Sequence, residues 1–182
     1  MSPTKSHASS KRRVIRRSRR DSRRFFTASL EQLEPRVLLS GLNLSGGAVV
    51  YQGGAGENTL VVERFAELGV DKYRFTDTED ITVSGTQQES CSGTGTKVVE
   101  CTANDVTSID IDLGGGSDSV TLAGLTLSGN LDVASDSVTL AGPVSSDGKV
   151  TITADGGAIT DNNATLGPDI EAPEIVLTAD TG

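Results

Sequence analysis

Two glycine-rich turns carry the side chains that could do chemistry in this chain. Residues 53–60 read Gly-Gly-Ala-Gly-Glu-Asn-Thr-Leu and follow the pattern Gly-Gly-x-Gly-x-Asp-x-apolar, except that Asn58 stands where Asp is expected. Residues 113–120 read Leu-Gly-Gly-Gly-Ser-Asp-Ser-Val and follow it with Asp118 in place. Glycine permits such tight turns, and carbonyl and carboxylate oxygens are the ligands that calcium prefers.

Calcium is therefore the cation that these turns suggest, with Gly114, Gly116, Asp118 and Asp136 as candidate ligands. Asp136 occupies the position equivalent to Asp118 in the next repeat, but no glycines precede it. A calcium site needs ligands from at least two stacked turns, and the two glycine turns lie 60 residues apart in sequence. Two interpretations of Asp118 stay open: a calcium ligand, or an aspartate of a solvated turn or ladder.

The two cysteines, Cys91 and Cys101, are the other candidate pair. Two thiols cannot build a zinc site, and the single histidine, His7, lies far away in the basic N-terminal tail. In an exported chain these cysteines would form a disulfide that closes a short loop. The alternative is two buried free thiols in a reduced chain.

The residue types do not favour catalysis. Neither thiol has a neighbouring base in the sequence, no phosphate-binding loop leads into a helix, and the acids recur at positions that read as outward-facing. A polysaccharide lyase would need clustered acids or bases on adjacent coils, where this chain supplies single aspartates. We therefore expect no enzyme activity, no catalytic residue and no cofactor beyond the possible calcium.

An internal repeat indicates how these residues are positioned. Residues 117–124, Ser-Asp-Ser-Val-Thr-Leu-Ala-Gly, recur unchanged as residues 135–142, an offset of 18. A fixed period of this length on alternating apolar residues is typical of a β-solenoid, in which each coil presents the same residues to the next. The prediction fails unless Val120 and Val138 are neighbours in adjacent strands.

The rest of the chain after residue 40 also reads as strands and turns. Residues 41–105 contain alternating segments separated by glycine-rich and aspartate-rich connections, which predicts a hairpin-rich β segment. Residues 106–182 carry shorter, regular strands and are expected to form the solenoid coils. No polar terminal coil follows the last strand, so we expect the chain to be the front end of a longer protein or a truncated one.

Charge separates the N-terminus from this body. The net charge is -9, yet residues 1–39 hold 11 lysines and arginines against three acids, which leaves five against 22 in residues 40–182. So dense a basic leader is expected to be disordered. Its position favours targeting over a nucleic-acid-binding arm, an anionic-membrane contact or a plain solvated tail. Its apolar runs are too short for a secretory core or a membrane-spanning helix.

A short motif behind this leader resembles a known family. The run Leu33-Glu34-Pro35-Arg36, with Leu38 and Leu39 after it, is similar to the LEPR-XLL domain at the start of very large, repetitive bacterial surface proteins. The resemblance covers about 20 residues and implies export to the cell envelope or beyond, with the export machinery as a partner of the leader. The same residues also fit a short helix capped by Ser29 and ended by Pro35.

The body resembles two further groups of exported proteins. Residues 53–122, with the glycine turns and paired cysteines, are similar to hemolysin-type (RTX-like) calcium-binding proteins. Residues from about 154 onward are similar to the repeats of filamentous-haemagglutinin-type surface proteins, which form right-handed parallel β-helices. The resemblance implies an all-β chain: a basic targeting leader (1–40), a hairpin segment (41–105) and a right-handed parallel β-helix (106–182).

These observations lead to three functional hypotheses. The first is an exported, non-enzymatic surface or secreted protein with a structural or adhesin-like role, whose partners would be components of the cell envelope or extracellular matrix. The second is a calcium-binding RTX-like secreted module that uses Asp118 and its neighbours. The third, nucleic-acid binding through the leader, is disfavoured because the body is strongly acidic.

Overall fold

Alternating apolar and polar residues produce sixteen strands and two short 3-10 helices in residues 39–164 and 167–180, the part of the chain that this computed structural model describes. The protein is all-β in these residues, and its larger sheet is mixed. The elements are β1 (Ser40–Ser45), β2 (Ala48–Gln52), β3 (Thr59–Glu67), β4 (Val70–Ser84), η1 (Gln88–Ser90), β5 (Cys91–Ser92), β6 (Thr96–Thr102), η2 (Ala103–Asp105), β7 (Ser108–Asp112), β8 (Ser119–Ala123), β9 (Leu125–Leu127), β10 (Leu131–Ser135), β11 (Ser137–Leu140), β12 (Val144–Ser146), β13 (Lys149–Asp155), β14 (Ile159–Asp161), β15 (Ile170–Glu171) and β16 (Glu174–Asp180).

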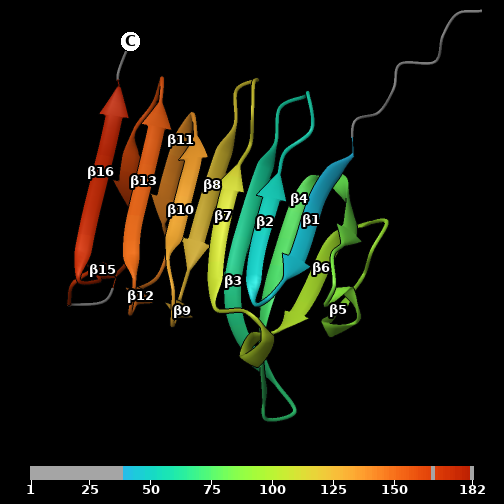
Figure 1. Cartoon of the computed structure of the whole chain (residues 1–182). Coiled ribbons are helices and arrows are strands. Elements are labelled where there is room, and N and C mark those ends of the chain that lie inside the picture. Colours follow the sequence, from blue (N-terminus) through green and yellow to red (C-terminus); the bar gives the residue numbers. More distant parts are fainter. Residues whose placement is uncertain (1–38, 165–166, 181–182) are drawn as a thin grey trace, which may run out of the picture. The chain divides into compact units, whose positions relative to one another are not determined.

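Five of these strands lie parallel and side by side in the order β2, β7, β10, β13 and β16 (Figure 1). Their register places inward-facing side chains of successive strands opposite one another, because side chains alternate between the two faces of a strand. The two rows run through Val49, Ile109, Leu131, Val150 and Ile175, and through Tyr51, Ile111, Val133, Ile152 and Leu177.

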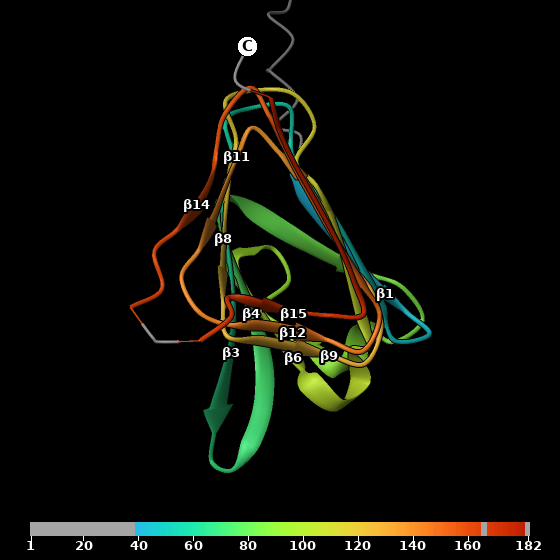
Figure 2. The same cartoon turned by 90° about the vertical axis from the view of Figure 1, so that its left-hand side faces the viewer.

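Two further sets of parallel strands complete the body: β3, β8, β11 and β14 in the same sheet, and β9, β12 and β15 in a second sheet. The repeat explains the first set, because Val120 of β8 lies opposite Val138 of β11, as the 18-residue offset predicts. Seen from the C-terminal end, the three sets enclose a triangular interior (Figure 2). Buried valine, leucine and isoleucine side chains fill it.

Strand β4 makes the larger sheet mixed. It pairs antiparallel with β3 and β6 along its first half and parallel with β1 along its second half, with an irregular register between Thr76 and Ile81. Because β1 also pairs antiparallel with β2, β4 and β1 connect the two sets of parallel strands. Strands from residues 41–105 thus share a sheet with strands from residues 106–182, through the pairs β2 with β7 and β3 with β8.

The hairpin of β3 and β4 continues past the body and is held by ion pairs. Arg74 bonds Glu63 and Glu100 at 2.9 and 2.8 Å, and Lys72 bonds Glu100 at 3.3 Å. Because these groups are partly exposed, each pair contributes little alone, but together they fix the alignment of β3, β4 and β6. Within the described residues, no helix has the length and hydropathy to span a membrane.

Candidate functional site

The two glycine turns singled out in the sequence lie in contact. Residues 53–58 connect β2 to β3, residues 113–118 connect β7 to β8, and both pairs of flanking strands are parallel neighbours (Figure 1). The Gly53 amide donates to the Asp112 carbonyl at 2.9 Å. Separation by 60 residues therefore does not prevent the two turns from stacking, which removes the geometric objection to a shared site.

Glycine is required where these turns touch. A Cβ on Gly53 would lie 2.5 Å from the Leu113 carbonyl oxygen, and a Cβ on Gly116 would lie 2.9 Å from the Gly56 carbonyl oxygen. Gly116 also has a φ of +153°, and Gly114 a φ of +78°. The glycines of the motif thus allow close backbone approach between neighbouring turns.

Asn58, Asp118 and Asp136 form a ladder at one corner of the body. Asp118 Oδ1 accepts a hydrogen bond from the Asn58 amide at 2.7 Å, and Asp136 Oδ2 accepts one from the Asp118 amide at 2.6 Å. Each carboxylate therefore satisfies a backbone donor of the preceding turn, where the strands begin. This contact gives Asp118 and Asp136 a structural role without a metal ion.

Asp118 nevertheless retains unused capacity. Its side chain is buried, with 2% of its surface exposed, so it is not the solvated turn residue that one interpretation expected. Asp118 Oδ2 and the Oδ1 atom of the buried Asn58 have no hydrogen-bond partner. Buried oxygens without donors are unusual in folded proteins, and a cation or an ordered water would satisfy them.

The acidic side chains themselves do not make a metal centre. In residues 39–164 and 167–180, no three His, Cys, Asp or Glu side chains gather closely enough to hold a metal ion. A cation at the glycine turns would thus depend on Asp118, the Asn58 amide oxygen and backbone carbonyls. Oxygen donors of this kind suit calcium better than zinc or another soft metal.

A buried polar cluster around Asp77 is the feature that sequence analysis missed. Asp77 Oδ2 accepts hydrogen bonds from Tyr51 Oη at 2.6 Å, Ser40 Oγ at 2.7 Å and Asn58 Nδ2 at 3.1 Å. Asp77 Oδ1 accepts from the Thr78 amide at 2.6 Å. The carboxylate thereby joins β1, β2, β4 and the first glycine turn.

Ionisation of this cluster follows from its surroundings. Burial acts to raise the pKa of Asp77, but the hydrogen bonds from Tyr51, Ser40 and Thr78 together outweigh it and hold the pKa below its usual value. Burial, reinforced by the hydrogen bond to Asp77, raises the pKa of Tyr51 well above its usual range. Asp77 is thus an anion and Tyr51 a neutral donor at neutral pH.

A signal for Asp77 was present in the sequence. Tyr73, Phe75 and Asp77 occupy alternate positions of β4, and all three side chains are buried. The segments 72–76 and 80–84 were read as separate strands, with Asp77 in the connection. A single strand of 15 residues instead places Asp77 on the inward face, in step with the two aromatic residues.

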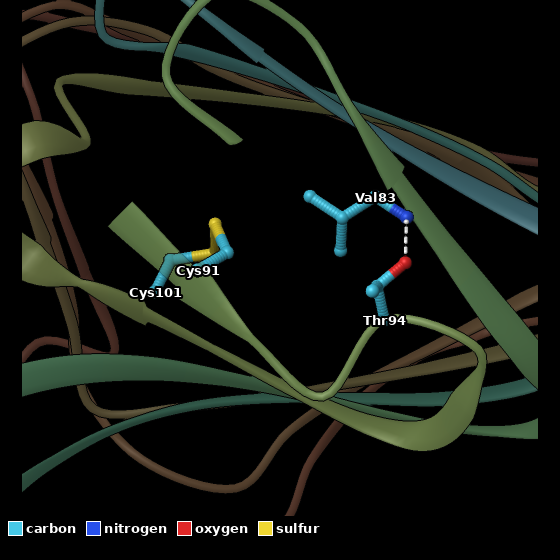
Figure 3. Close-up of a disulfide and its surroundings, with 4 residues drawn as sticks. All are labelled: Val83, Cys91, Thr94 and Cys101. Carbon is cyan, nitrogen blue, oxygen red and sulfur yellow. Dashed lines mark hydrogen bonds between the residues drawn. A yellow bond between two sulfur atoms is a disulfide. The ribbon is translucent and has the colours of Figure 1, made fainter. Parts of the chain in front are cut away.

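The cysteine pair forms the expected disulfide. Cys91 of β5 and Cys101 of β6 lie opposite one another in antiparallel strands and are bonded (Figure 3). The loop that follows Cys91 is held as well, because the Val83 amide donates to Thr94 Oγ1 at 2.9 Å. The disulfide therefore holds the loop of residues 85–95 against the strands that it accompanies.

Aspartates also line the outer face of β7 and β10. Asp110 lies opposite Asp132, and Asp112 follows on the same strand face. Burial, followed by repulsion from Asp132 and Asp112, raises the pKa of Asp110. The arrangement makes this face acidic and offers no base positioned against a nucleophile.

The leader and its motif lie largely outside the described residues. His7 and the motif residues Leu33, Glu34, Pro35, Arg36 and Leu38 fall in residues 1–38, whereas Leu39 is described and half-exposed. No family model, no curated protein and no solved structure matches the chain.

Proposed function

We propose that this chain is an exported, non-enzymatic repeat protein of the cell surface or the extracellular space, with a structural or adhesin-like role. Its body would be a right-handed parallel β-helix that presents three strand faces to its surroundings. The observation that carries the proposal is the in-register stacking of the repeat, with Val120 opposite Val138 and Thr121 opposite Thr139. Such stacking produces a rigid surface in which function resides in shape and binding.

Further features support export. The Cys91–Cys101 disulfide is of a kind that persists in oxidising compartments and is rare in the cytosol. The basic leader and the Leu33–Leu39 motif would address the chain to the export machinery. Envelope or matrix components would then be its partners, and the acidic body makes nucleic acid a poor one.

Export is tested by protease accessibility of the full chain on intact cells of the organism that produces it. We expect digestion without lysis, and retention inside the cell when Leu33, Glu34, Pro35 and Arg36 are all replaced by Ala. Replacing Ser2 and Thr4 by Ala is the matched control and should leave export unchanged. Full protection of the wild-type chain until lysis would overturn the proposal.

The stacked coil is tested by engineered disulfides on its outer face. Thr121 and Thr139 lie opposite one another in adjacent strands, so the pair Thr121→Cys and Thr139→Cys should oxidise readily. The pair Thr121→Cys and Thr160→Cys is the control, because β11 lies between β8 and β14. Cross-linking of the control pair alone would contradict the stacking, and a crystal structure would fix the handedness.

A calcium-binding module is the second candidate function. Its support is specific: Asp118 Oδ2 and Asn58 Oδ1 are buried without hydrogen-bond partners, beside two glycine turns in contact. Gly114 and Gly116 would contribute backbone carbonyls and Asp118 a carboxylate. Asp136 would contribute indirectly, because one of its oxygens already accepts the Asp118 amide.

Calorimetric titration separates this candidate from the first. Calcium binding predicts released or absorbed heat and a rise in the unfolding temperature that magnesium at equal concentration does not reproduce. Asp118→Asn should abolish both effects, whereas Asp80→Asn, an exposed acid of β4, should preserve them. A calcium titration with neither heat nor stabilisation would remove the calcium module and leave the surface-protein proposal intact.

A further inference from the structure

The far edge of β16 offers backbone groups to a further strand. Among the described residues β16 pairs only with β13, and the Gly156 amide donates to the Asp180 carbonyl at 2.9 Å. Peptide groups alternate in direction along a strand, so the even-numbered residues of β16 bond to β13. The odd-numbered residues, Ile175, Leu177 and Ala179, turn their N–H and C=O groups to the free edge.

The side chains of this strand are equally incomplete. Ile175 and Leu177 are 43% and 49% exposed, although they continue rows whose preceding members, Val150 and Ile152, are fully buried. Their exposure arises because no strand covers them on the next level. An open edge with inward-facing apolar side chains is favourable for strand addition, since pairing buries both the peptide groups and the side chains.

We propose that β16 pairs antiparallel with β16 of a second copy of this chain, about a twofold axis at Val176. In this register Ile175 lies opposite Leu177 of the second copy, and Val176 lies opposite its own equivalent. Apolar cross-strand pairs of this kind stabilise antiparallel strands. The free groups of Ile175 and Leu177 supply four intermolecular hydrogen bonds.

Charge selects this register over its neighbour. With the axis at Val176, Glu174 lies opposite Thr178 of the second copy and no two acids face each other. With the axis at Leu177, Glu174 would lie opposite Asp180 twice, and like charges directly opposite destabilise a sheet. The strand is therefore self-complementary in one register.

The same operation covers the open end of the body. A twofold axis normal to the sheet keeps the inward faces of both copies on one side. Ile159 of β14 and Ile170 of β15, both only partly buried, lie at the same end as β16 and would meet the second copy. The partner is thus a second copy joined tail to tail, which closes after two chains.

Cysteine substitutions in the full chain test the register. Val176 bonds to β13 and would form a non-hydrogen-bonded pair with its equivalent, at a Cα separation of about 4.5 Å, which a disulfide can bridge. We expect Val176→Cys to cross-link on mild oxidation and Leu177→Cys to do so at least tenfold more slowly. The native cysteines do not interfere, because they are bonded to each other. Cross-linking through Leu177→Cys but not Val176→Cys would overturn the register.

The second copy itself is tested by sedimentation over a range of concentrations. We expect a dimer that weakens at least tenfold in Leu177→Pro, because proline removes an N–H that faces the free edge and is tolerated there. Circular dichroism and the intact native disulfide verify that the variant is folded, and Val176→Thr serves as a folded control that still dimerises. A wild-type chain that stays monomeric, or that grows into filaments, would overturn the proposal.

Discussion

The backbone amide of Asn58 donates a hydrogen bond to Asp118 Oδ1 at 2.7 Å, although 60 residues separate the two in sequence. Between them the chain leaves the body, forms the hairpin of β3 and β4 with β6 beside it, and returns one level further along. The contact fixes where the returning chain resumes stacking. Changes at this contact should therefore affect the whole body.

Gly53 should be the most sensitive glycine of the first turn. In Gly53→Ala the added methyl would lie 2.5 Å from the Leu113 carbonyl oxygen, which forces the two turns apart. We expect a loss of about 1–3 kcal/mol in the free energy of unfolding, measured by urea denaturation. Gly56→Ala in the same turn is the control, because its Cβ would meet no atom within 4 Å. Equal effects of the two variants would contradict the stacking account.

Removing the Asp77 carboxylate should destabilise the protein strongly. In Asp77→Ala, the buried donors of Tyr51 and Ser40 lose their acceptor, and unsatisfied buried groups are costly. We expect a loss of about 3 kcal/mol or more in the free energy of unfolding. Asp80→Ala, an exposed position of the same strand, should change it by less than about 0.5 kcal/mol. A small effect of Asp77→Ala would mean that water replaces the carboxylate.

Acid should weaken this same cluster. Because the folded pKa of Asp77 lies below its unfolded value of about 3.9, its contribution is complete above that value. It is lost as the pH falls through the folded pKa. The stability difference between the wild type and Asp77→Asn should therefore shrink between about pH 5 and pH 2. A difference that stays constant over that range would show that Asp77 does not titrate as proposed.

Asp110 should show the opposite dependence. Burial and the charges of Asp132 and Asp112 raise its pKa, so its ionised form is disfavoured in the folded state. Asp110→Asn should raise the unfolding temperature at about pH 7 and have no effect at about pH 3, where the carboxyl is protonated in both states. Asp80→Asn is the control. An unfolding temperature lowered by Asp110→Asn at neutral pH would refute the repulsion.

The disulfide should stabilise the protein mainly by restricting the unfolded chain. Replacing Cys91 and Cys101 together by Ala should cost about 2–3 kcal/mol, as expected for a loop of this length. A thiol reductant should lower the urea midpoint of the wild type by a similar amount and leave the double variant unchanged. If the reductant has no effect on a fully reduced wild-type chain, the bridge contributes nothing to stability.

Local features were predictable from sequence, and long-range ones were not. The exact repeat of residues 117–124 predicted that Val120 and Val138 would stack, because identical side chains in register repeat the same contacts. The cysteine pair was equally readable from its spacing. The contact between Asn58 and Asp118 was not, since periodicity cannot tell where a chain resumes its register after a long insertion.

Asp77 illustrates a second limit. Its sequence neighbours are polar, and a lone aspartate between two strand-like segments suggests a turn. Its burial depends on Tyr51 and Ser40, which come from other strands and supply the donors that make a buried carboxylate tolerable. Such compensation by distant residues leaves no local pattern in the sequence.

The match between Ser119–Leu122 and Ser137–Leu140 has an evolutionary consequence. Because each 18-residue unit presents to the next what it receives from the last, an in-frame duplication of one unit in mid-body inserts a whole storey. The hairpins at one extremity and β16 at the other would be untouched. Reach along the long axis can thus be tuned in fixed increments by slippage in the gene, without redesigning either extremity.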